Sequence, residues 1–433
     1  MLISKISGNQ CPSVRRIAAG IDFGTSNSAI SCISGSNFDV EIIRIENDTE
    51  TIPTALFYLP NGSLLFGSAA SEAFIRNEEG RFIHSIKSIL GTSMMNEYTR
   101  INNKWIKFSS IIGRFISFLK SKLDEHAGGN VDSVVFGRPV KFNEADEALD
   151  KHAEDLLAEI AKRSGFKFVE FQYEPVAAAF SHEQSITHER LAIVVDVGGG
   201  TSDFTMIKIG GRLKDKLDRS GDILANTGVK VGGDAFDKGL SYHSFMPLLG
   251  RDGTLGEKKL PMPSYIYHEL SDWNGINFMY SVKNLREIRK IHNESNDKEK
   301  TYRMMRLIET ERAHELLGIV ERVKIDLTQL SSTECILDPV ADKPLVYVSR
   351  TQFDEYAVDI YEKIRKAMVD CLKLSGLKAD EIDMAIMTGG STEINQVRNI
   401  VRSIVPNAVF SEQNKFISVC KGLAYEAKRR FIF

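Results

Sequence analysis

The sequence predicts an α/β protein built from two similar lobes, and three observations support this fold class. Apolar segments typical of β-strands alternate with segments of helical periodicity along most of the 433 residues. One motif occurs twice, in GIDFGTSNS and in VDVGGGTSD: an apolar strand, an acidic residue, a glycine turn and hydroxyl side chains. The length, with 42% hydrophobic residues, suffices for two hydrophobic cores. We therefore expect an internal duplication, with Asp22 and Asp196 at equivalent positions.

The first half contains both strand and helix patterns. RIAAGIDFG, AISCIS and VEIIRIEN predict three strands in an antiparallel meander, and VDSVVFGRPVKF predicts a further strand. IIGRFISFLKSKLDEH has the apolar spacing of a helix. The segment from Asn143 to Gly165 predicts another helix, with Asn143 as its N-cap, acidic residues in its first turn and Gly165 as its stop.

The second half repeats the strand motif and adds a helical region. LAIVVDVGGGTSDFTMIKIG predicts two strands around a glycine turn. The segment from Val231 to about Leu330 is the least strand-like, and we expect a helical subdomain there. MAIMTGGSTEINQVRNIVRSIV predicts a strand, a turn and a helix, and SVCKGLAYEAKRR predicts a last helix.

The charge balance argues against nucleic acid or a membrane surface as a partner. The 55 Lys and Arg residues face 58 Asp and Glu residues, for a net charge of −3. No apolar run approaches the roughly 20 residues of a membrane span, and the N-terminal sixteen residues lack the apolar core of a signal peptide. The five cysteines lie far apart, which favours free thiols over a disulfide framework or a zinc site. We expect a cytoplasmic protein with a polar N-terminal lead-in.

Three glycine turns follow apolar strands: GIDFGTSNS, VDVGGGTSD and TGGSTEINQV. None is a P-loop, and the first two run into strands, so we expect hairpins whose backbone N–H groups face phosphate oxygens. The third runs into a helix, whose N-terminus favours an anion. Carboxylates beside such turns would repel a polyphosphate unless a cation intervened. Mg²⁺ held between Asp22 and Asp196 resolves this conflict, although each aspartate alone could be a turn-capping residue.

Five separate segments, among them the three glycine turns and YEPVAAAF, resemble the ATPase domain of the DnaK-type heat-shock chaperones, in the actin, hexokinase and heat-shock ATPase superfamily. The resemblance covers about Ala18 to Arg429. Because KRRFIF directly follows the last helix of this resemblance, we expect the chain to resemble truncated, YegD-like members that lack the peptide-binding domain.

This resemblance implies a duplicated actin-like, ribonuclease H-like ATPase fold. Each lobe would have a mixed five-stranded sheet with flanking helices, and nucleotide would bind in the cleft between the lobes. We expect lobe I at 1–190, with a small inserted subdomain at about 48–125 and a closing C-terminal helix at about 412–433. Lobe II is expected at 191–411, with a largely helical inserted subdomain at about 231–320.

The resemblance also implies ATP or ADP and Mg²⁺ as ligands. Lys87 would lie at the transferred phosphate and Glu174 by the hydrolytic water, with Asp196, Asp203 and Thr201 completing the catalytic group; Asp22 and Asp196 would hold the metal. Without the family, Lys87 could be a solvated helix residue and Glu174 a plain loop acid. The nucleotide-binding positions would be Gly24, Thr25, Ser26, Asn27, Gly198, Gly199, Gly200, Thr201, Gly232, Gly233, Glu321, Lys324, Thr328, Gly389, Gly390 and Ser391.

Two positions depart from the family pattern. Ile325 and Glu393 stand where the family usually has two arginines that stack on adenine, so we expect weaker nucleotide binding. The leading hypothesis is an ATP-hydrolysing, chaperone-like protein that acts on an unidentified protein partner, and the region around Asp252 to Lys300 is a candidate docking site. Alternatives are a nucleotide-sensing module with negligible hydrolysis, a small-molecule kinase of the same superfamily, and an actin-like filament protein.

Overall fold

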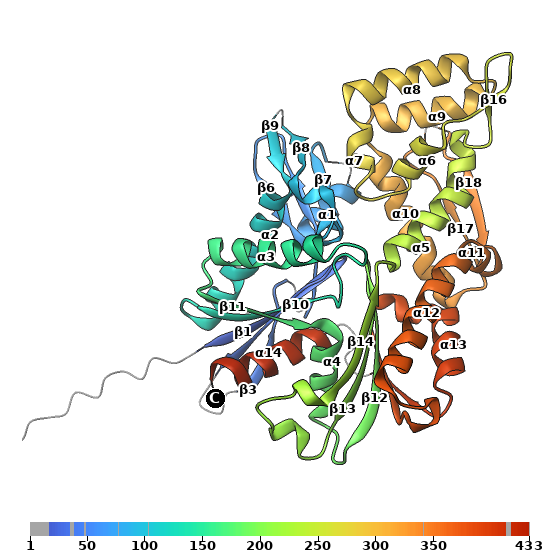
Figure 1. Ribbon diagram of the computed structural model, residues 1–433. Helices are drawn as coiled ribbons and strands as arrows, with labels where there is room; N and C mark the ends of the chain where they lie inside the picture. The colour runs from blue at the N-terminus through green and yellow to red at the C-terminus, as the bar shows by residue number, and fades with distance from the viewer. Residues whose placement is uncertain are drawn as a thin grey trace, which may run out of the picture.

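Two mixed β-sheets form the base of the molecule, and a smaller subdomain lies above each of them (Figure 1). The computed structural model describes residues 17–34, 39–46, 49–76, 78–102, 104–340, 342–412 and 417–432. The expected N-terminal lead-in lies outside these residues.

The first sheet has the strand order β11-β10-β1-β2-β3, and the short strand β4 pairs with β2 off this path. It therefore contains six strands, one more than expected, because the segment after β3 returns to the edge of β2. The strands are β1 Ala18–Phe23, β2 Asn27–Ser34, β3 Asp39–Ile43, β4 Ile52–Pro53, β10 Ser133–Arg138 and β11 Phe168–Tyr173.

The second sheet has five strands in the order β14-β13-β12-β19-β20 and the same topology as the path through the first. In each sheet the first strand along the chain is central, the next two pair antiparallel on one side, and the last two pair parallel on the other. The expected duplication and antiparallel meander are confirmed. The strands are β12 Arg190–Val197, β13 Ser202–Ile209, β14 Ile223–Val229, β19 Met384–Thr388 and β20 Val409–Ser411.

Equivalent helices connect the parallel strands, as right-handed crossovers require. In the first half these are α2 (Phe108–Ala127) and α3 (Glu147–Arg163); in the second they are α12 (Val358–Ser375) and α13 (Asn395–Ile404). The helix pattern at 143–165 is confirmed, but its N-cap is Asp146, whose side chain accepts from Ala148 N and Leu149 N. Asn143 is not the N-cap: its side chain caps the preceding turn, accepting from the backbone N–H groups of residues 145 and 146.

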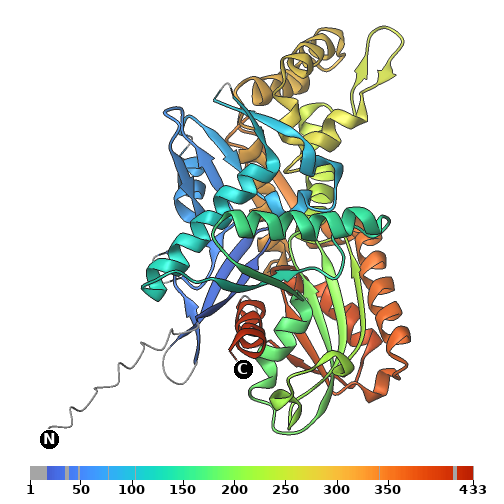
Figure 2. The same cartoon turned by 60° about the vertical axis from the view of Figure 1, so that its left-hand side comes forward.

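Two closing helices, α4 (Glu174–Glu183) and α14 (Ser418–Phe431), lie side by side between the sheets (Figures 1 and 2). Helix α14 packs against β1, β2 and β10, whereas α4 packs against β12 and β13. Their backbones approach so closely that a Cβ atom at Gly422 would lie 1.7 Å from the Ala177 carbonyl oxygen. Only glycine fits there, and the close packing couples the two halves of the molecule.

A small subdomain precedes α2 above the first sheet. It contains a three-stranded sheet, one helix, two 3₁₀ turns and a hairpin. Its elements are β5 Leu56–Tyr58, β6 Leu64–Phe66, α1 Gly67–Ile75, β7 Arg81–Ile83, the 3₁₀ turns Ile86–Ile89 and Ser93–Asn96, β8 Tyr98–Ile101 and β9 Lys104–Lys107.

The second subdomain, above the other sheet, is mainly helical. Two short hairpins add β15 Thr254–Leu255 with β16 Leu260–Pro261, and β17 Ser332–Ile336 with β18 Leu345–Ser349. Its helices, with α11 leading back to the sheet, are α5 Gly233–Leu240, α6 Ser264–Leu270, α7 Ile276–Met279, α8 Val282–Glu294, α9 Lys298–Glu309, α10 Ala313–Gln329 and α11 Arg350–Tyr356.

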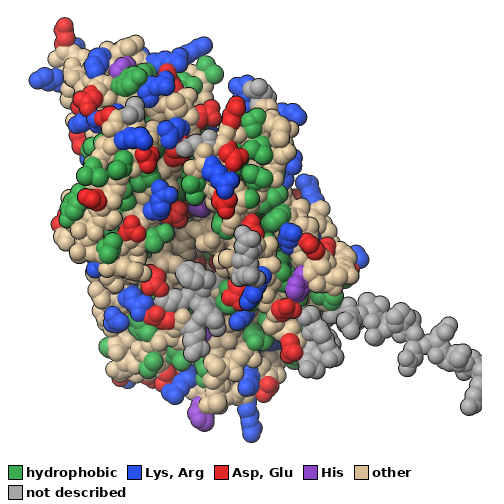
Figure 3. All heavy atoms as spheres, turned by 180° about the vertical axis from the view of Figure 1, so that it is seen from behind, with side chains coloured by type: hydrophobic (Ala, Val, Ile, Leu, Met, Phe, Trp, Pro, Cys, Tyr) green, Lys and Arg blue, Asp and Glu red, His purple; other side chains and the backbone are tan. Residues whose placement is uncertain are grey.

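The surface matches the balanced composition. Figure 3 shows basic and acidic side chains interspersed over one face, without a single-sign patch. Among the residues that the structure describes, no helix has both the length and the apolar character needed to cross a bilayer.

Candidate functional site

The two aspartates of the repeated motif occupy equivalent places in the two sheets. Asp22 is the penultimate residue of β1 and pairs with Ala29 in β2. Asp196 is the penultimate residue of β12 and pairs with Asp203 in β13, so each pairs with the residue seven positions further along. Each strand then enters a glycine turn, which places both carboxylates at the same end of their sheets.

The two glycine turns face each other closely. In the first, a Cβ atom at Gly24 would lie 2.0 Å from the Asn27 carbonyl oxygen, so the tight hairpin requires glycine. In the second, Cβ atoms at Gly199 and Gly200 would lie 2.6 Å from Ser26 Oγ and 3.1 Å from Thr25 Oγ1, respectively. The turns from the two halves of the chain therefore meet, with small side chains and bare backbone between them.

A buried ion pair lies beside these turns. Lys87, in the 3₁₀ turn after β7, is 7% exposed, and Glu174, the first residue of α4, is 8% exposed. Lys87 Nζ lies 2.5 Å from Glu174 Oε1. Neither residue is the solvated helix residue or plain loop acid of the alternative hypotheses.

Four carboxylates surround this single lysine. Burial, together with the Glu174 charge, raises the pKa of Asp22 to about 7, and the Lys87 charge offsets part of this shift. Burial and the Glu174 charge also raise the pKa of Asp203 to about 7, although the Thr201 hydroxyl and the Val140 N–H bind its carboxylate.

Asp196 is more strongly affected. Burial and the charges of Glu174, Asp203 and Asp22 raise its pKa well above the ordinary value. Burial alone would lower the pKa of Lys87, but the surrounding carboxylates raise it. The cluster therefore has more negative than positive charge, and buried charges of one sign need a counter-ion.

The surplus of carboxylate oxygens fits Mg²⁺, which prefers oxygen ligands and is commonly held by one or two carboxylates together with phosphate oxygens. Asp22 and Asp196 are the residues that would hold it, since they stand at equivalent positions beside the two turns. The Asp22 charge contributes to the raised pKa of Asp196, and a divalent cation bound between the two carboxylates would relieve this repulsion.

The third glycine turn closes against the second. Gly389 has φ of +81°, and a Cβ atom there would lie 2.9 Å from Asp196 Oδ1. Gly390 begins a 3₁₀ turn, in which Ser391 donates to the Gly198 carbonyl oxygen at 3.2 Å. This 3₁₀ turn, rather than α13 directly, follows β19.

The N-terminus of α5 meets the second turn from another side. The backbone N–H groups of Gly233 and Asp234 donate to the carbonyl oxygens of Gly198 and Gly199, at 2.9 and 2.8 Å. Gly232 is the N-cap of α5, and a Cβ atom there would lie 2.6 Å from the Gly198 carbonyl oxygen. The predicted glycines at 232 and 233 are thus in direct contact with the turn.

Helix α10 contributes Lys324, whose Nζ lies 2.9 Å from Asp237 Oδ2 and 3.3 Å from the Gly233 carbonyl oxygen. Burial raises the pKa of Asp237 to about 7 despite Lys324, and the Glu321 charge adds to the shift. Lys324 is 9% exposed, so this pair ties α10 to α5 at the edge of the site. For Lys324 to bind nucleotide, as the sequence predicts, its ion pair with Asp237 would have to break.

Two of the predicted nucleotide-binding residues lie outside the group of buried carboxylates and Lys87. Asn27 is exposed at the start of β2, and the Thr328 hydroxyl donates to the Ile325 carbonyl oxygen of its own helix. Ile325 is 55% exposed and Glu393 is also exposed, so both departures from the family pattern lie at the surface.

Sequence reasoning missed three contributors. Asp234 and Asp237 lie one turn apart on α5, and the buried Asp237 Oδ1 atom has no hydrogen-bond partner among the residues that the structure describes. Val140 contributes only its backbone N–H, to Asp203 at 2.7 Å. The acidic residues that follow Gly232 and Gly233 could have indicated this part of the site from the sequence. A backbone N–H donor such as that of Val140 leaves no pattern in the sequence.

An aromatic junction joins the two upper subdomains. The rings of His84 and Trp273 are 4.8 Å apart, and the Arg81 guanidinium lies over the Tyr280 ring at 5.0 Å. Asn274 Nδ2 donates to Ser88 Oγ at 2.6 Å, next to Lys87. The first subdomain thus contacts the helical subdomain one residue away from Lys87.

Comparison with known proteins identifies the family of the chain. The family described as Hsp70 protein matches residues 18–248 and 288–428. The DnaK chaperone of Mycoplasmoides gallisepticum is 26% identical over 402 residues, which cover 90% of this chain and 56% of that protein. The DnaK chaperone of Thermosipho melanesiensis is 25% identical over 422 residues, which cover 96% of this chain and 59% of that protein.

The chain therefore spans little more than half the length of these relatives. The match covers both sheets, all three glycine turns and the Lys87–Glu174 pair. The chain belongs to the Hsp70 family and has the two-lobed, actin-like fold of its nucleotide-binding ATPase domain.

Proposed function

We propose that this protein is a magnesium-dependent ATPase whose lobes close on nucleotide and thereby act on a protein partner. The observation that carries the proposal is the single buried lysine among four carboxylates, placed where two glycine turns from duplicated halves meet. Phosphoryl transfer needs positioning and charge neutralisation more than covalent catalysis, and this arrangement supplies both.

The residues divide the work by their chemistry. The backbone N–H groups around Gly24 and Gly198 to Gly200 would hold phosphate oxygens. Lys87 would neutralise charge on the transferred phosphate, for which it must exchange part of its contact with Glu174. Asp22 and Asp196 would hold Mg²⁺, which would supply further neutralisation of phosphate charge.

Hydrolysis also requires an oriented water molecule. Its oxygen would attack the γ-phosphorus, the bond to the ADP oxygen would break, and a carboxylate would accept the proton of the water. Glu174, Asp196 and Asp203 are the candidates. A general base works best with a pKa near the operating pH, and the pKa of about 7 at Asp203 suits this role.

The aromatic junction supports a closing motion. Trp273, Asn274 and Tyr280 all lie between residues 248 and 288, in the stretch that the family match leaves out. Since Asn274 binds Ser88, one residue after Lys87, a change at the phosphate site is transmitted to the helical subdomain. The helical region from Asp252 to Lys300 is accordingly our candidate for partner docking.

The experiment is a calorimetric titration with ADP, ATP and GTP in the presence of Mg²⁺, followed by phosphate release from each nucleotide that binds. The proposal expects tighter binding of adenine nucleotides and slow phosphate release. Binding without release would select a nucleotide-sensing module, and phosphate transfer only to an added small molecule would select a kinase. No binding by any nucleotide would overturn the proposal. We place the protein in the cytoplasm as part of the same proposal.

A further inference from the structure

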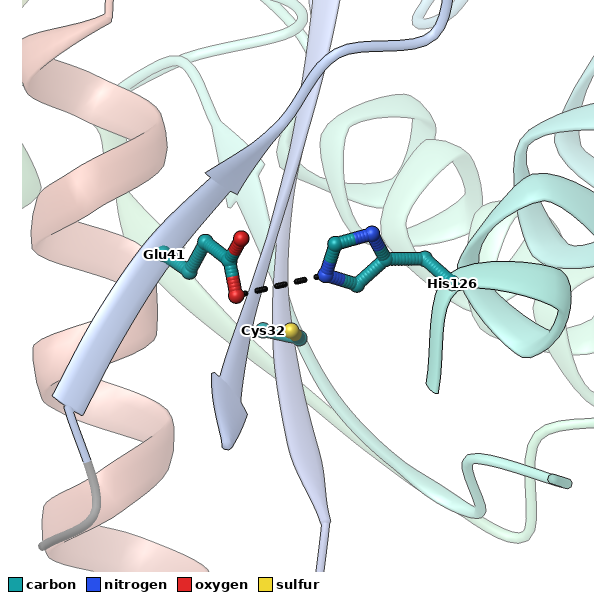
Figure 4. Close-up of side chains that lie close together, drawn as sticks. All are labelled: Cys32, Glu41 and His126. Carbon is teal, nitrogen blue, oxygen red and sulfur yellow. Dashed lines mark ion pairs between the residues drawn. The ribbon is translucent and has the colours of Figure 1, made fainter. Parts of the chain in front are cut away.

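We propose a second metal site, for Zn²⁺, at the edge of the first sheet and separate from the nucleotide cleft. It consists of Cys32 on β2, Glu41 on β3 and His126 in the last turn of α2 (Figure 4). One ligand atom from each residue lies within 4.8 Å of the other two. The sequence argued against a zinc site because its cysteines are isolated, but the fold supplies the missing ligands from two other elements.

Strand pairing fixes the first two ligands. Cys32 pairs directly with Glu41 in the antiparallel register of β2 and β3, so their side chains project from the same face of the sheet. That face is the one covered by α2, since Cys32 packs in the same apolar cluster as Phe115 and Leu119. The end of α2 then brings His126 to the same point.

The three side chains differ in their exposure to solvent, and the site is open on one side. Cys32 is fully buried, whereas the His126 and Glu41 side chains are 34% and 51% exposed. His126 Nε2 lies 3.3 Å from Glu41 Oε2, above the sulfur (Figure 4). A metal ion would enter from the surface and reach the thiolate at the base.

The donor set selects the metal. A thiolate, an imidazole and a carboxylate are all ligands of Zn²⁺, and three protein ligands leave its fourth tetrahedral position for water. Mg²⁺ prefers oxygen ligands, so the two metal sites differ in chemistry. Zinc bonds of about 2.0 to 2.3 Å put neighbouring donors about 3.3 to 3.8 Å apart. The His126–Glu41 distance already falls in this range, and the exposed side chains can adjust toward the sulfur.

The setting favours a cation. Helix α2 ends at Ala127, and the C-terminal end of a helix carries partial negative charge. Binding would displace the thiol proton of Cys32 and join edge strand β3 to α2. The simpler alternative is an ion pair between His126 and Glu41 that covers a buried thiol.

Cobalt titration separates these two outcomes, because a Co²⁺–thiolate bond has a charge-transfer absorption band that an ion pair lacks. The full chain, reduced and freed of bound metal, is titrated with Co²⁺ and then with Zn²⁺ in buffer with excess Mg²⁺, which competes for the carboxylates of Asp22 and Asp196. We expect one Co²⁺ per chain, the thiolate band, and loss of the band as Zn²⁺ replaces Co²⁺. The substitution Cys32→Ala removes the band, and His126→Gln and Glu41→Gln each weaken Co²⁺ binding more than tenfold.

The controls are Cys371→Ala, at another buried cysteine, and His152→Gln, at an exposed histidine on α3; both should bind as the unchanged protein does. If Cys32→Ala does not fold, the two exposed ligands decide the outcome, since neither is part of the core. The proposal would be overturned if neither Co²⁺ nor Zn²⁺ bound, or if Co²⁺ bound without the thiolate band. It would also be overturned if His126→Gln and Glu41→Gln bound Co²⁺ with the thiolate band and with the affinity of the unchanged protein.

Discussion

Lys87 Nζ and Glu174 Oε1 lie 2.5 Å apart in the interior of the protein, joining the small subdomain of the first half to the start of α4. Both residues come from segments with no sequence likeness to each other, and each alone would be costly to bury. Paired, they hold a cation and a carboxylate beside the two glycine turns, where a transferred phosphate and a water molecule would meet.

The lysine is expected to be needed for hydrolysis but not for folding. Lys87→Ala should lower single-turnover hydrolysis about 100- to 1000-fold, the usual effect of removing one preorganised group that stabilises charge in a transition state. Lys151→Ala, at an exposed lysine of α3, is the matched control and should hydrolyse ATP normally. Equal rates for both variants would show that Lys87 has no part in the chemistry.

Asp22 and Asp196 are expected to make nucleotide binding depend on Mg²⁺. Asp22→Asn and Asp196→Asn each remove a negative charge from an overloaded cluster. In EDTA these variants should bind ADP more tightly than the unchanged protein, and added Mg²⁺ should strengthen binding less. Isothermal titration at several Mg²⁺ concentrations measures both effects, with Asp155→Asn on the exposed face of α3 as the control. An unchanged Mg²⁺ dependence in both variants would remove these residues from the metal site.

The raised pKa values predict a pH dependence of stability in the metal-free protein. The pKa of Asp203 is about 7 in the fold against an ordinary value of 3.8. Between these pH values the folded state retains a proton that the unfolded state releases, so the free energy of unfolding falls as pH rises and the loss is complete above about pH 7.

Asp203→Asn removes this titration, so its stability relative to the unchanged protein should increase from about pH 4 to about pH 7. Chemical denaturation in EDTA at a series of pH values tests this. Asp380→Asn, at an exposed aspartate, should show no such trend. Parallel stability curves for Asp203→Asn and the unchanged protein would contradict the expected shift.

The two tryptophans give a direct test of lobe closure. Trp273 is 5% exposed at the junction between the subdomains, and Trp105 is 71% exposed on β9. In a Trp105→Phe protein, the fluorescence of Trp273 should change when ADP or ATP binds. In a Trp273→Phe protein, Trp105 should report no change. If only Trp105 responds, the motion does not pass through the aromatic junction.

A substitution at the expected adenine-binding end of the site should raise the affinity for ADP. Glu393 is exposed, at the position that the resemblance to the family assigns to an arginine. Glu393→Arg should tighten ADP binding about 2- to 30-fold, because a stacked guanidinium contributes about 0.5 to 2 kcal/mol. Glu355→Arg, at an exposed glutamate of α11, controls for the added charge. Equal gains in the two variants would assign the effect to net charge alone.

Local motifs allowed much of this site to be predicted. Asp22 and Asp196 are predictable because each lies in a short strand-turn motif that can be recognised from neighbouring residues alone. Their equivalence follows from the repetition of that motif. Lys87 and Glu174 were identified only through resemblance to a family, since nothing near either residue in the sequence indicates an ion pair.

Contacts that depend on the tertiary fold were not predictable. The Lys324–Asp237 pair requires α10 to lie against α5, and the Val140 N–H reaches Asp203 only because the loop after β10 crosses to the second sheet. Asn143 and Asp146 are both good caps three residues apart, and the sequence does not decide which one begins the helix.

Single-turnover ATP hydrolysis with Mg²⁺ tests the central claim most directly, measured for the unchanged protein and for Lys87→Ala, Glu174→Gln and Asp196→Asn. We predict slow phosphate release by the unchanged protein, a loss of release in each variant, and far-ultraviolet circular dichroism spectra that show the fold retained. Phosphate release at the same rate in all four proteins, with ATP bound, would contradict the assignment of this cleft as the catalytic site.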